Sequence, residues 1–348
     1  MQLELKPDFA ETRQRWEAFW RGDKLDRPML LLHCLRPNQP PSSWPYPVRP
    51  DQEPGPQIEN ALTFMRSREY FAESVPNFMM EFAAGHFSAL IGSRIEYGEQ
   101  LSGNGWLVPF VESWDETELR FQRDGFYWQR TVELARACRA RCDGVFLVNA
   151  PVQSAGLDAL AAVRGTQRLL TDLVDCPEKV QEALAQVRAA YDEIVAAVAR
   201  EFAWDTFGSC NWCGLYSSGY TNTIQCDFSC MISSGMFAEF ELANLRHQAS
   251  HYDQVTYHLD GPQARHHLPA VCTVPGIEVI QYVAIPREDP AHVESVYRQA
   301  LDQGKAIVRG VSAEVARDLW RKYPRARLVL QVDVKTRREA EAFMASFH

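Results

Sequence analysis

Short apolar runs alternate along the chain with stretches whose apolar positions recur at a helical period. Runs of strand length occupy residues 27–34, 75–80, 144–150, 204–210, 254–259, 276–283, 305–310 and 326–334. Helical patterns follow most of these runs, and a further amphipathic helix is expected near the N-terminus. Strands that alternate with helices are typical of a parallel sheet.

Eight strand–helix units fit a closed barrel, so we expect an α/β fold formed by a single (β/α)8 TIM barrel over residues 1–348. A doubly wound open sheet is the alternative, but no glycine-rich phosphate loop follows the first apolar run. Residues 35–56 are rich in proline and lack a helical period, which predicts a long first loop. The sequence contains no evident repeat or linker.

Composition and charge exclude several classes of protein. The 348 residues carry a formal net charge of −9, which disfavours binding to a nucleic-acid backbone. The apolar runs are too short to cross a bilayer, and no apolar leader is visible, so a cytoplasmic protein is expected. Nine cysteines in a chain of this kind predict free thiols or metal ligands and not a disulfide framework.

Polar or ionisable residues stand at the end of every predicted strand. In a barrel of parallel strands these ends form the mouth, where catalytic groups collect. Loop-facing side chains explain one or two such residues but not a complete ring, and the ring therefore predicts an enzyme. Its members are His33 and Cys34, Glu81, Asn149, Cys210 and Asn211, His258 and Asp260, Gln281 and Tyr282, Arg309, and Gln331 and Asp333.

His258 and Asp260 are the strongest catalytic candidates. They lie two residues apart in an extended segment, so their side chains point to the same side. An imidazole and a carboxylate suit a zinc ion with an open position, and they equally suit an acid–base pair. The alternative is a histidine that a carboxylate orients for structural reasons. Glu81 and Asp227 are the further catalytic candidates.

Cysteines and aromatic residues gather after the fourth predicted strand. Cys210 and Cys213 form a C-x-x-C pair, and Cys226 and Cys230 follow, but this spacing fits no standard zinc motif. Free thiols beside a pocket are therefore favoured over a four-cysteine site. The candidates for binding a small-molecule substrate are His33, Asn149, Trp212, Tyr216, Gln281, Tyr282 and Arg309, with loop packing as the alternative for the aromatic residues.

Residues 221–283, from "TNTIQC" to "VIQYV", resemble the uroporphyrinogen decarboxylase superfamily. The segments "RGTQRLLTDLVDCPEKV" and "VPNFMMEFAAGHFSALIG" resemble it too, and "RQRWEAFWRGDKLDRP" is similar to the opening of its uncharacterised bacterial branch. The resemblance implies a (β/α)8 barrel. It also implies one of two activities: cofactor-free decarboxylation of tetrapyrroles, or zinc-dependent methyl transfer between corrinoids and thiols. A homodimer is expected by resemblance alone.

The chain departs from both branches of that superfamily. The decarboxylases hold substrate carboxylates with an arginine-rich segment after the first strand, whereas residues 33–47 contain one arginine, Arg36. The methyltransferases carry a His-x-Cys-Gly element, and the matching positions here are His258, Asp260 and Gly261. No cysteine follows Cys272. A metal site would therefore contain nitrogen and oxygen ligands in place of a sulfur-rich set.

Two enzymatic hypotheses follow from these residues and the resemblance. In the first, His258 and Asp260 bind zinc, with Cys272 as a further ligand candidate, and a corrinoid on a partner protein exchanges a methyl group with a thiol or alcohol. In the second, a metal-free decarboxylase or lyase acts on a small carboxylic acid or a tetrapyrrole-like substrate, and Arg309 holds its carboxylate. A non-catalytic binding protein is the third interpretation.

Overall fold

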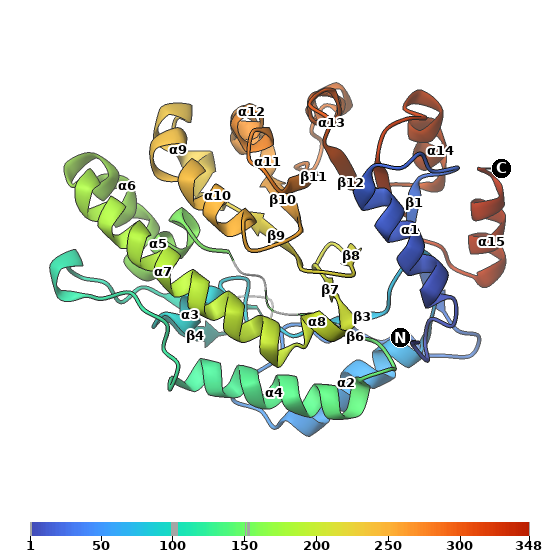
Figure 1. Cartoon of the computed structure of the whole chain (residues 1–348), viewed down its shortest axis with the longest axis horizontal. Coiled ribbons are helices and arrows are strands. Elements are labelled where there is room, and N and C mark those ends of the chain that lie inside the picture. Colours follow the sequence, from blue (N-terminus) through green and yellow to red (C-terminus); the bar gives the residue numbers. More distant parts are fainter. Residues whose placement is uncertain (1, 99–103, 150, 152–153, 348) are drawn as a thin grey trace.

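The computed structural model of the chain describes residues 2–98, 104–149, 151 and 154–347. Its fold is α/β, with helices arranged around the outside of the strands (Figure 1). Seven strands form the large sheet: β1 (Met29–Leu35), β2 (Arg68–Ala72), β9 (Thr221–Gln225), β10 (Gln254–Asp260), β11 (Ile277–Val283), β12 (Ala306–Gly310) and β13 (Leu328–Gln331). Their order is β2-β1-β13-β12-β11-β10-β9, and all neighbours are parallel except β1 and β2.

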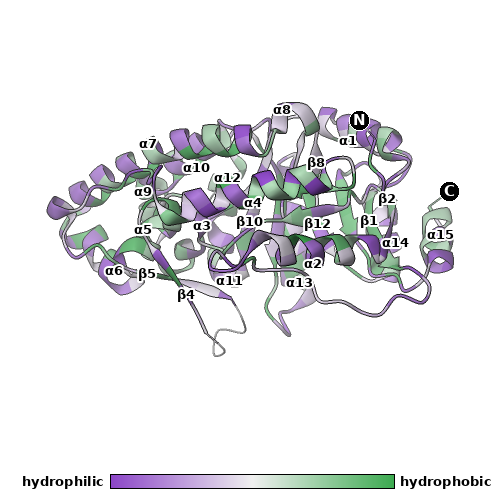
Figure 2. Ribbon diagram, turned by 90° about the horizontal axis from the view of Figure 1, so that it is seen from below, coloured by the Kyte–Doolittle hydropathy of each residue, from purple (hydrophilic) through white to green (hydrophobic). Residues whose placement is uncertain are grey.

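Three two-stranded pairs accompany the large sheet. The parallel pair contains β3 (Asn77–Met79) and β6 (Leu147–Asn149). The antiparallel pairs contain β4 (Arg94–Tyr97) with β5 (Gly105–Val108), and β7 (Ser209–Cys210) with β8 (Tyr216–Ser217). The β4–β5 hairpin projects from the body of the molecule (Figure 2).

Helices connect most of these strands. They are α1 (Phe9–Arg21), α2 (Pro54–Arg66), α3 (His86–Leu90), α4 (Phe126–Cys142), α5 (Leu157–Arg164), α6 (Thr166–Asp175), α7 (Pro177–Glu201), α8 (Trp204–Phe207), α9 (Ser234–Phe240), α10 (Leu242–Ala249), α11 (Gly261–Ala264), α12 (Leu268–Cys272), α13 (Pro290–Asp302), α14 (Ala313–Lys322) and α15 (Arg337–Ala345). The short 3-10 turns are η2 (Trp114–Glu116), η3 (Asp227–Met231) and η4 (Arg265–His267). Among the described residues, no helix is long and apolar enough to cross a membrane.

Local sequence signals explain where these helices begin and end. Ser312 caps α14 because its side chain accepts a hydrogen bond from the Val315 amide, and α7 begins at Pro177, whose fixed φ suits the first turn. Helix α1 ends at Arg21, and the Gly22 that follows it has a φ of 76°, which favours glycine. Apolar and polar residues occupy opposite faces of the outer helices, as their sequence pattern predicts (Figure 2).

Each of the eight predicted apolar runs contains a strand, and the prediction of an α/β fold is confirmed. The predicted ring of eight strands is not established, because the strand pairs of the described residues do not close. One neighbour of β1 is the antiparallel β2, while β3 and β6 pair only with each other. In the run at residues 204–210 the first part forms helix α8, and the unpredicted strand β9 lies beside β10.

The hydrophobic core consists of two clusters on opposite faces of the strands. In β1, Leu30 belongs to the larger cluster beneath the helices, whereas Met29 belongs to the smaller one. The smaller cluster combines residues from the large sheet with residues from the two-stranded pairs and from helix α1: Phe9, Trp16, Phe19, Met29, Leu147, Cys210, Tyr216, Val279, Val308 and Val329 are among its members. The short pairs thus share an interior with the large sheet.

Candidate functional site

The register of the central strands places His258 between two glutamines. His258 in β10 pairs with Gln225 in β9 on one side and with Gln281 in β11 on the other. Side chains of directly paired residues point to the same face of a sheet. His258 Nδ1 lies 2.6 Å from Gln281 Oε1, and Gln225 Nε2 donates to Asp227 Oδ2 at 2.8 Å. The two glutamines therefore orient His258 and Asp227.

Asp227, His258 and Asp260 form a compact group of metal-ligating side chains. Each offers one ligand atom, and these atoms all lie within 4.8 Å of one another. Because Gln281 Oε1 can only accept, His258 Nδ1 carries the hydrogen and the lone pair is on Nε2. One imidazole nitrogen and two carboxylate oxygens form a donor set that suits zinc. The imidazole is half-buried, and both carboxylates are exposed.

Asp158 supports this group and was not identified from the sequence. Its Oδ2 accepts a hydrogen bond from the Asp227 amide at 2.9 Å, and its Oδ1 accepts one from the Phe228 amide at 2.8 Å. Asp158 thereby holds the start of η3, from which the Asp227 side chain projects. An acidic residue in the first turn of a helix is common for local reasons, so nothing in the sequence distinguishes Asp158 as part of a site.

The environment of Asp227 favours its protonated form. Removal from water by the surrounding protein is the main cause, and repulsion from Asp158 and Asp260 adds to it. Together these effects raise the pKa of Asp227 to about 8, although the carboxylate remains accessible from the cavity that it lines. A cation bound between the carboxylates would replace the proton.

Asp227→Asn is expected to change how the stability of the metal-free protein depends on pH. A carboxyl group whose pKa rises from 3.8 to about 8 on folding contributes stability that is complete below pH 4 and is lost progressively as the pH approaches 8. The variant lacks this loss. Solvent screening limits the effect, so the variant should gain about 1 to 3 °C in Tm relative to the wild type between pH 5 and pH 9. Thermal unfolding of both proteins in chelator measures this difference in Tm. Wild-type and variant Tm values that change in parallel from pH 5 to pH 9 would contradict the prediction.

Three cavities lie near the group, and Asp227 itself lines one of them. Asp227 lines one of about 580 Å³ together with Asp158 and Gln225. Gln281 lines a second, of about 320 Å³, which also contains two predicted substrate residues, Tyr282 and Arg309. A third cavity of about 450 Å³ is lined by His33 and Trp212, and the Trp212 ring packs edge-on against the His258 ring with centroids 5.0 Å apart. Side chains that contact His258, or that belong to its partners in the neighbouring strands, thus line three different cavities.

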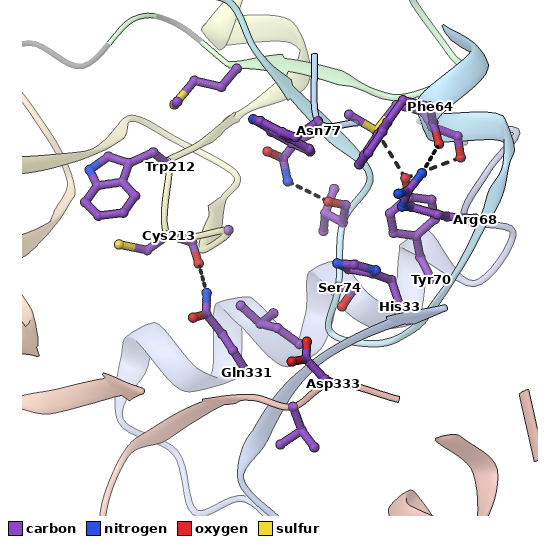
Figure 3. Close-up of a pocket in the computed structure, with 17 residues that line it drawn as sticks. His33, Phe64, Arg68, Tyr70, Ser74, Asn77, Trp212, Cys213, Gln331 and Asp333 are labelled. Carbon is purple, nitrogen blue, oxygen red and sulfur yellow. Dashed lines mark hydrogen bonds between the residues drawn. The ribbon is translucent and has the colours of Figure 1, made fainter. Parts of the chain in front are cut away.

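The cavity of about 450 Å³ combines aromatic walls with charged groups (Figure 3). His33 lies between Arg68 and Asp333, and partial removal from water inside the cavity together with the Arg68 charge lowers the pKa of His33, although its side chain stays exposed to the cavity. The Arg68 guanidinium stacks on the Phe64 ring and donates to Ser42, Phe64 and Ser67. These contacts are all with uncharged groups.

The predicted long first loop also lines cavities. Trp44 contributes to the cavity of about 450 Å³, and Tyr46 contributes to the cavity of about 580 Å³. The Tyr46 hydroxyl donates to Glu81 Oε2 at 3.2 Å. The loop is shorter than predicted because α2 begins at Pro54.

Several predicted site residues lie outside the group around His258. Glu81 is buried, and its carboxylate is covered by Tyr46 of the first loop, whose hydroxyl donates to it. Asn149 is buried, and its amide nitrogen donates to Asn77 Oδ1 at 2.7 Å, so it lies behind the cavity wall to which Asn77 contributes. Neither side chain belongs to the metal-ligating group.

The assignments of Tyr216 and Cys272 require correction. Tyr216 packs on Phe9 within the smaller core cluster, and its hydroxyl donates to the Phe207 carbonyl at 3.2 Å, so it is not a wall of the cavities described above. Cys272 ends α12, near Lys305, whose ammonium bonds the carbonyl of Ile277 at the start of β11. That is the opposite end of the strand from Gln281, so Cys272 is not a ligand partner of His258.

The four cysteines of the region do not gather into a metal site. Cys210, Cys213 and Cys226 are buried, whereas Cys230 is exposed. Among the described residues, the groups of three or more metal-ligating side chains contain no cysteine. Burial raises the pKa of the Cys213 thiol to about 12. These residues are free thiols, as the sequence favoured.

Comparison with known proteins shows the fold but not the family. No family model matches the chain, and no curated protein matches it. Among solved structures, a methyltransferase from Methanosarcina mazei is similar, with a TM-score of 0.62 and 11% sequence identity. The similarity covers 97% of this chain and 98% of that chain. The chain therefore shares the fold of that protein along nearly all of its length.

Proposed function

We propose that this protein is a methyltransferase-type enzyme whose reaction takes place at Asp227, His258 and Asp260. The observation that carries the proposal is the convergence of one imidazole and two carboxylates within 4.8 Å, beside a cavity of about 580 Å³ that Asp227 lines. Similarity to a methyltransferase fold supports the same class of reaction. The donor is a methylated corrinoid on a partner protein or a methylated small molecule, and the acceptor is a thiol or an alcohol.

The proposal includes a zinc ion held by His258 Nε2 and the two carboxylates. When bound, the metal supplies a Lewis acid that lowers the pKa of the acceptor thiol or alcohol. Gln281 keeps the hydrogen on Nδ1 of His258 and so leaves Nε2 as the ligand atom. Asp158 and Gln225 hold the backbone and the carboxylate of Asp227 in place. Trp212 shields one side of the imidazole from water.

A (β/α)8 barrel is the architecture that we propose for this enzyme. The smaller core cluster supports it, because residues of β1, β6, β7, β11, β12 and β13 meet in that one interior. In such a barrel, β9 and β10 would present Asp227 and Asp260 at the mouth, where their strands end.

Metal content and methyl transfer test the proposal together. Purified protein should contain about one zinc ion at this group, and removal by chelator should abolish transfer from methylcobalamin to 2-mercaptoethanol under anaerobic conditions. In that reaction the thiolate forms a carbon–sulfur bond, the cobalt–carbon electron pair stays on cobalt as cob(I)alamin, and the thiol proton passes to solvent. Visible absorbance follows the loss of methylcobalamin. Protein that neither contains nor binds zinc would overturn the zinc site.

A metal-free decarboxylase or lyase is the second candidate, and the pKa of about 8 at Asp227 favours it. A carboxyl group with that pKa is protonated at neutral pH and can donate its proton to a carbanion left by loss of CO₂. Arg309 lines the same cavity as Gln281 and would hold a substrate carboxylate. Release of CO₂ from small carboxylic acids that persists in strong chelator would favour this candidate over methyl transfer.

A further inference from the structure

Two outer segments carry a second histidine–carboxylate group that the proposed reaction does not use. Asp192 lies on α7, His247 lies in the last turn of α10, and His251 follows just beyond that helix. His247 Nε2 is 2.9 Å from Asp192 Oδ1, and His251 Nε2 is 2.8 Å from the same oxygen. The ligand atoms of the three side chains all lie within 4.8 Å of one another.

We infer that Asp192, His247 and His251 form a zinc site that joins α7 to the end of α10. The two histidines are four residues apart, the spacing that places both rings on one side of a helical turn. Two imidazole nitrogens and one carboxylate oxygen are ligands that zinc prefers. The side chains retain solvent exposures of 28%, 24% and 53% for His247, His251 and Asp192, so water completes the coordination.

The core beneath the site holds the two imidazoles in place. The buried Tyr191 ring contacts both of them edge-on, with centroid distances of 6.2 Å to His247 and 5.3 Å to His251. The Tyr191 hydroxyl is itself bonded to the Tyr252 hydroxyl at 2.9 Å. This support places the donor atoms before metal arrives, which lowers the conformational cost of binding.

The geometry places both imidazoles around one ion position. The two histidine rings lie edge to face with centroids 5.2 Å apart, and both Nε2 atoms reach the same oxygen of Asp192. His247 Nε2 also lies 3.3 Å from the Arg188 carbonyl oxygen. One zinc ion at this position would link α7 to the segment that leads into β10.

Zinc chloride titration of the chelator-treated full-length protein, followed by calorimetry, tests the site. The wild type should bind two zinc ions, and His258→Ala should keep the site on α7 and α10. In the His258→Ala background, Asp192→Asn and His251→Ala should each weaken the remaining site by on the order of tenfold or more. His292→Ala, which removes an exposed histidine on α13, is the matched control and should change nothing.

A second readout reports on the location of the metal. In the His258→Ala protein, zinc should slow amide hydrogen exchange in α7 and α10 but not in α13. Asp192→Asn is nearly isosteric and guards against loss of folding, which circular dichroism monitors. Equal zinc binding with and without Asp192→Asn and His251→Ala would overturn the site, as would an equal loss in His292→Ala. If the group around His258 does not bind zinc, the wild type and His258→Ala will instead bind the same number of zinc ions, and this result leaves the site on α7 and α10 intact.

Discussion

His258→Ala is expected to remove zinc from the candidate active site and to lower methyl transfer by about 10²–10⁴-fold. The imidazole supplies the nitrogen ligand of the group, and the two carboxylates that remain would repel each other without it. Elemental analysis and the methylcobalamin assay measure the two effects. Zinc content is the decisive readout, because a metal-free enzyme that uses His258 for proton transfer would also lose activity.

Two further variants are expected to have a smaller effect and no effect on zinc binding at this site. Gln281→Leu removes the hydrogen-bond partner of His258 Nδ1 and should weaken zinc binding by about 10- to 100-fold while leaving all three ligands in place. His266→Ala removes an exposed histidine outside the group and should have no effect on zinc at this site. Full zinc content and full turnover in His258→Ala would show that the reaction takes place elsewhere.

Glu73→Gln is expected to cause a large loss of stability, about 3–5 kcal/mol. The Glu73 carboxylate is 1% exposed and receives two hydrogen bonds from Arg27, at 2.7 and 2.8 Å, and one from Arg15 at 2.7 Å. It also accepts from the Leu30 amide at 2.8 Å. Glu73 therefore ties α1 to the start of β1, and an amide in its place leaves the buried Arg27 charge uncompensated.

Equilibrium unfolding in urea measures the loss, and an exposed ion pair provides the control. Arg337 and Glu341 lie 3.5 Å apart on α15 and are both more than half exposed, so Glu341→Gln should change the free energy of unfolding by less than about 1 kcal/mol. If Glu73→Gln and Glu341→Gln destabilise the protein equally, the buried ion pair does not have the role assigned to it.

The parts of the fold that the sequence predicted correctly depend on local pattern. The segments at residues 254–259 and 276–283 are short runs rich in Val, Ile, Leu and Tyr, and most of their residues are buried, so strand propensity and length identify them. The sequence did not predict strand β9, because four of its five residues are Thr, Asn or Gln. The strand is nevertheless almost wholly buried. Helix α2 was hidden by Pro54 and Pro56, which occupy its first turn.

The candidate site divides in the same way. The spacing of His258 and Asp260 is a local property of an extended strand, so the sequence alone paired them. Asp227 was a candidate, but its approach to His258 requires β9 to pair with β10 in one particular register. The Asp158 carboxylate meets the Asp227 amide across 69 residues, and Gln281 meets His258 across 23, and no local pattern encodes contacts over such separations.

By itself, the sequence determined eight of the segments that contain strands, most of the outer helices, and which strand ends carry an imidazole or a carboxylate. The tertiary structure alone decided the order of the strands, the exclusion of Tyr216 and Cys272 from the site, and the meeting of Asp227 with His258. The physical reason is the sequence separation over which each kind of interaction acts. Backbone propensity and apolar periodicity act over a few residues, whereas strand pairing and the packing of side chains join residues that are distant in the chain.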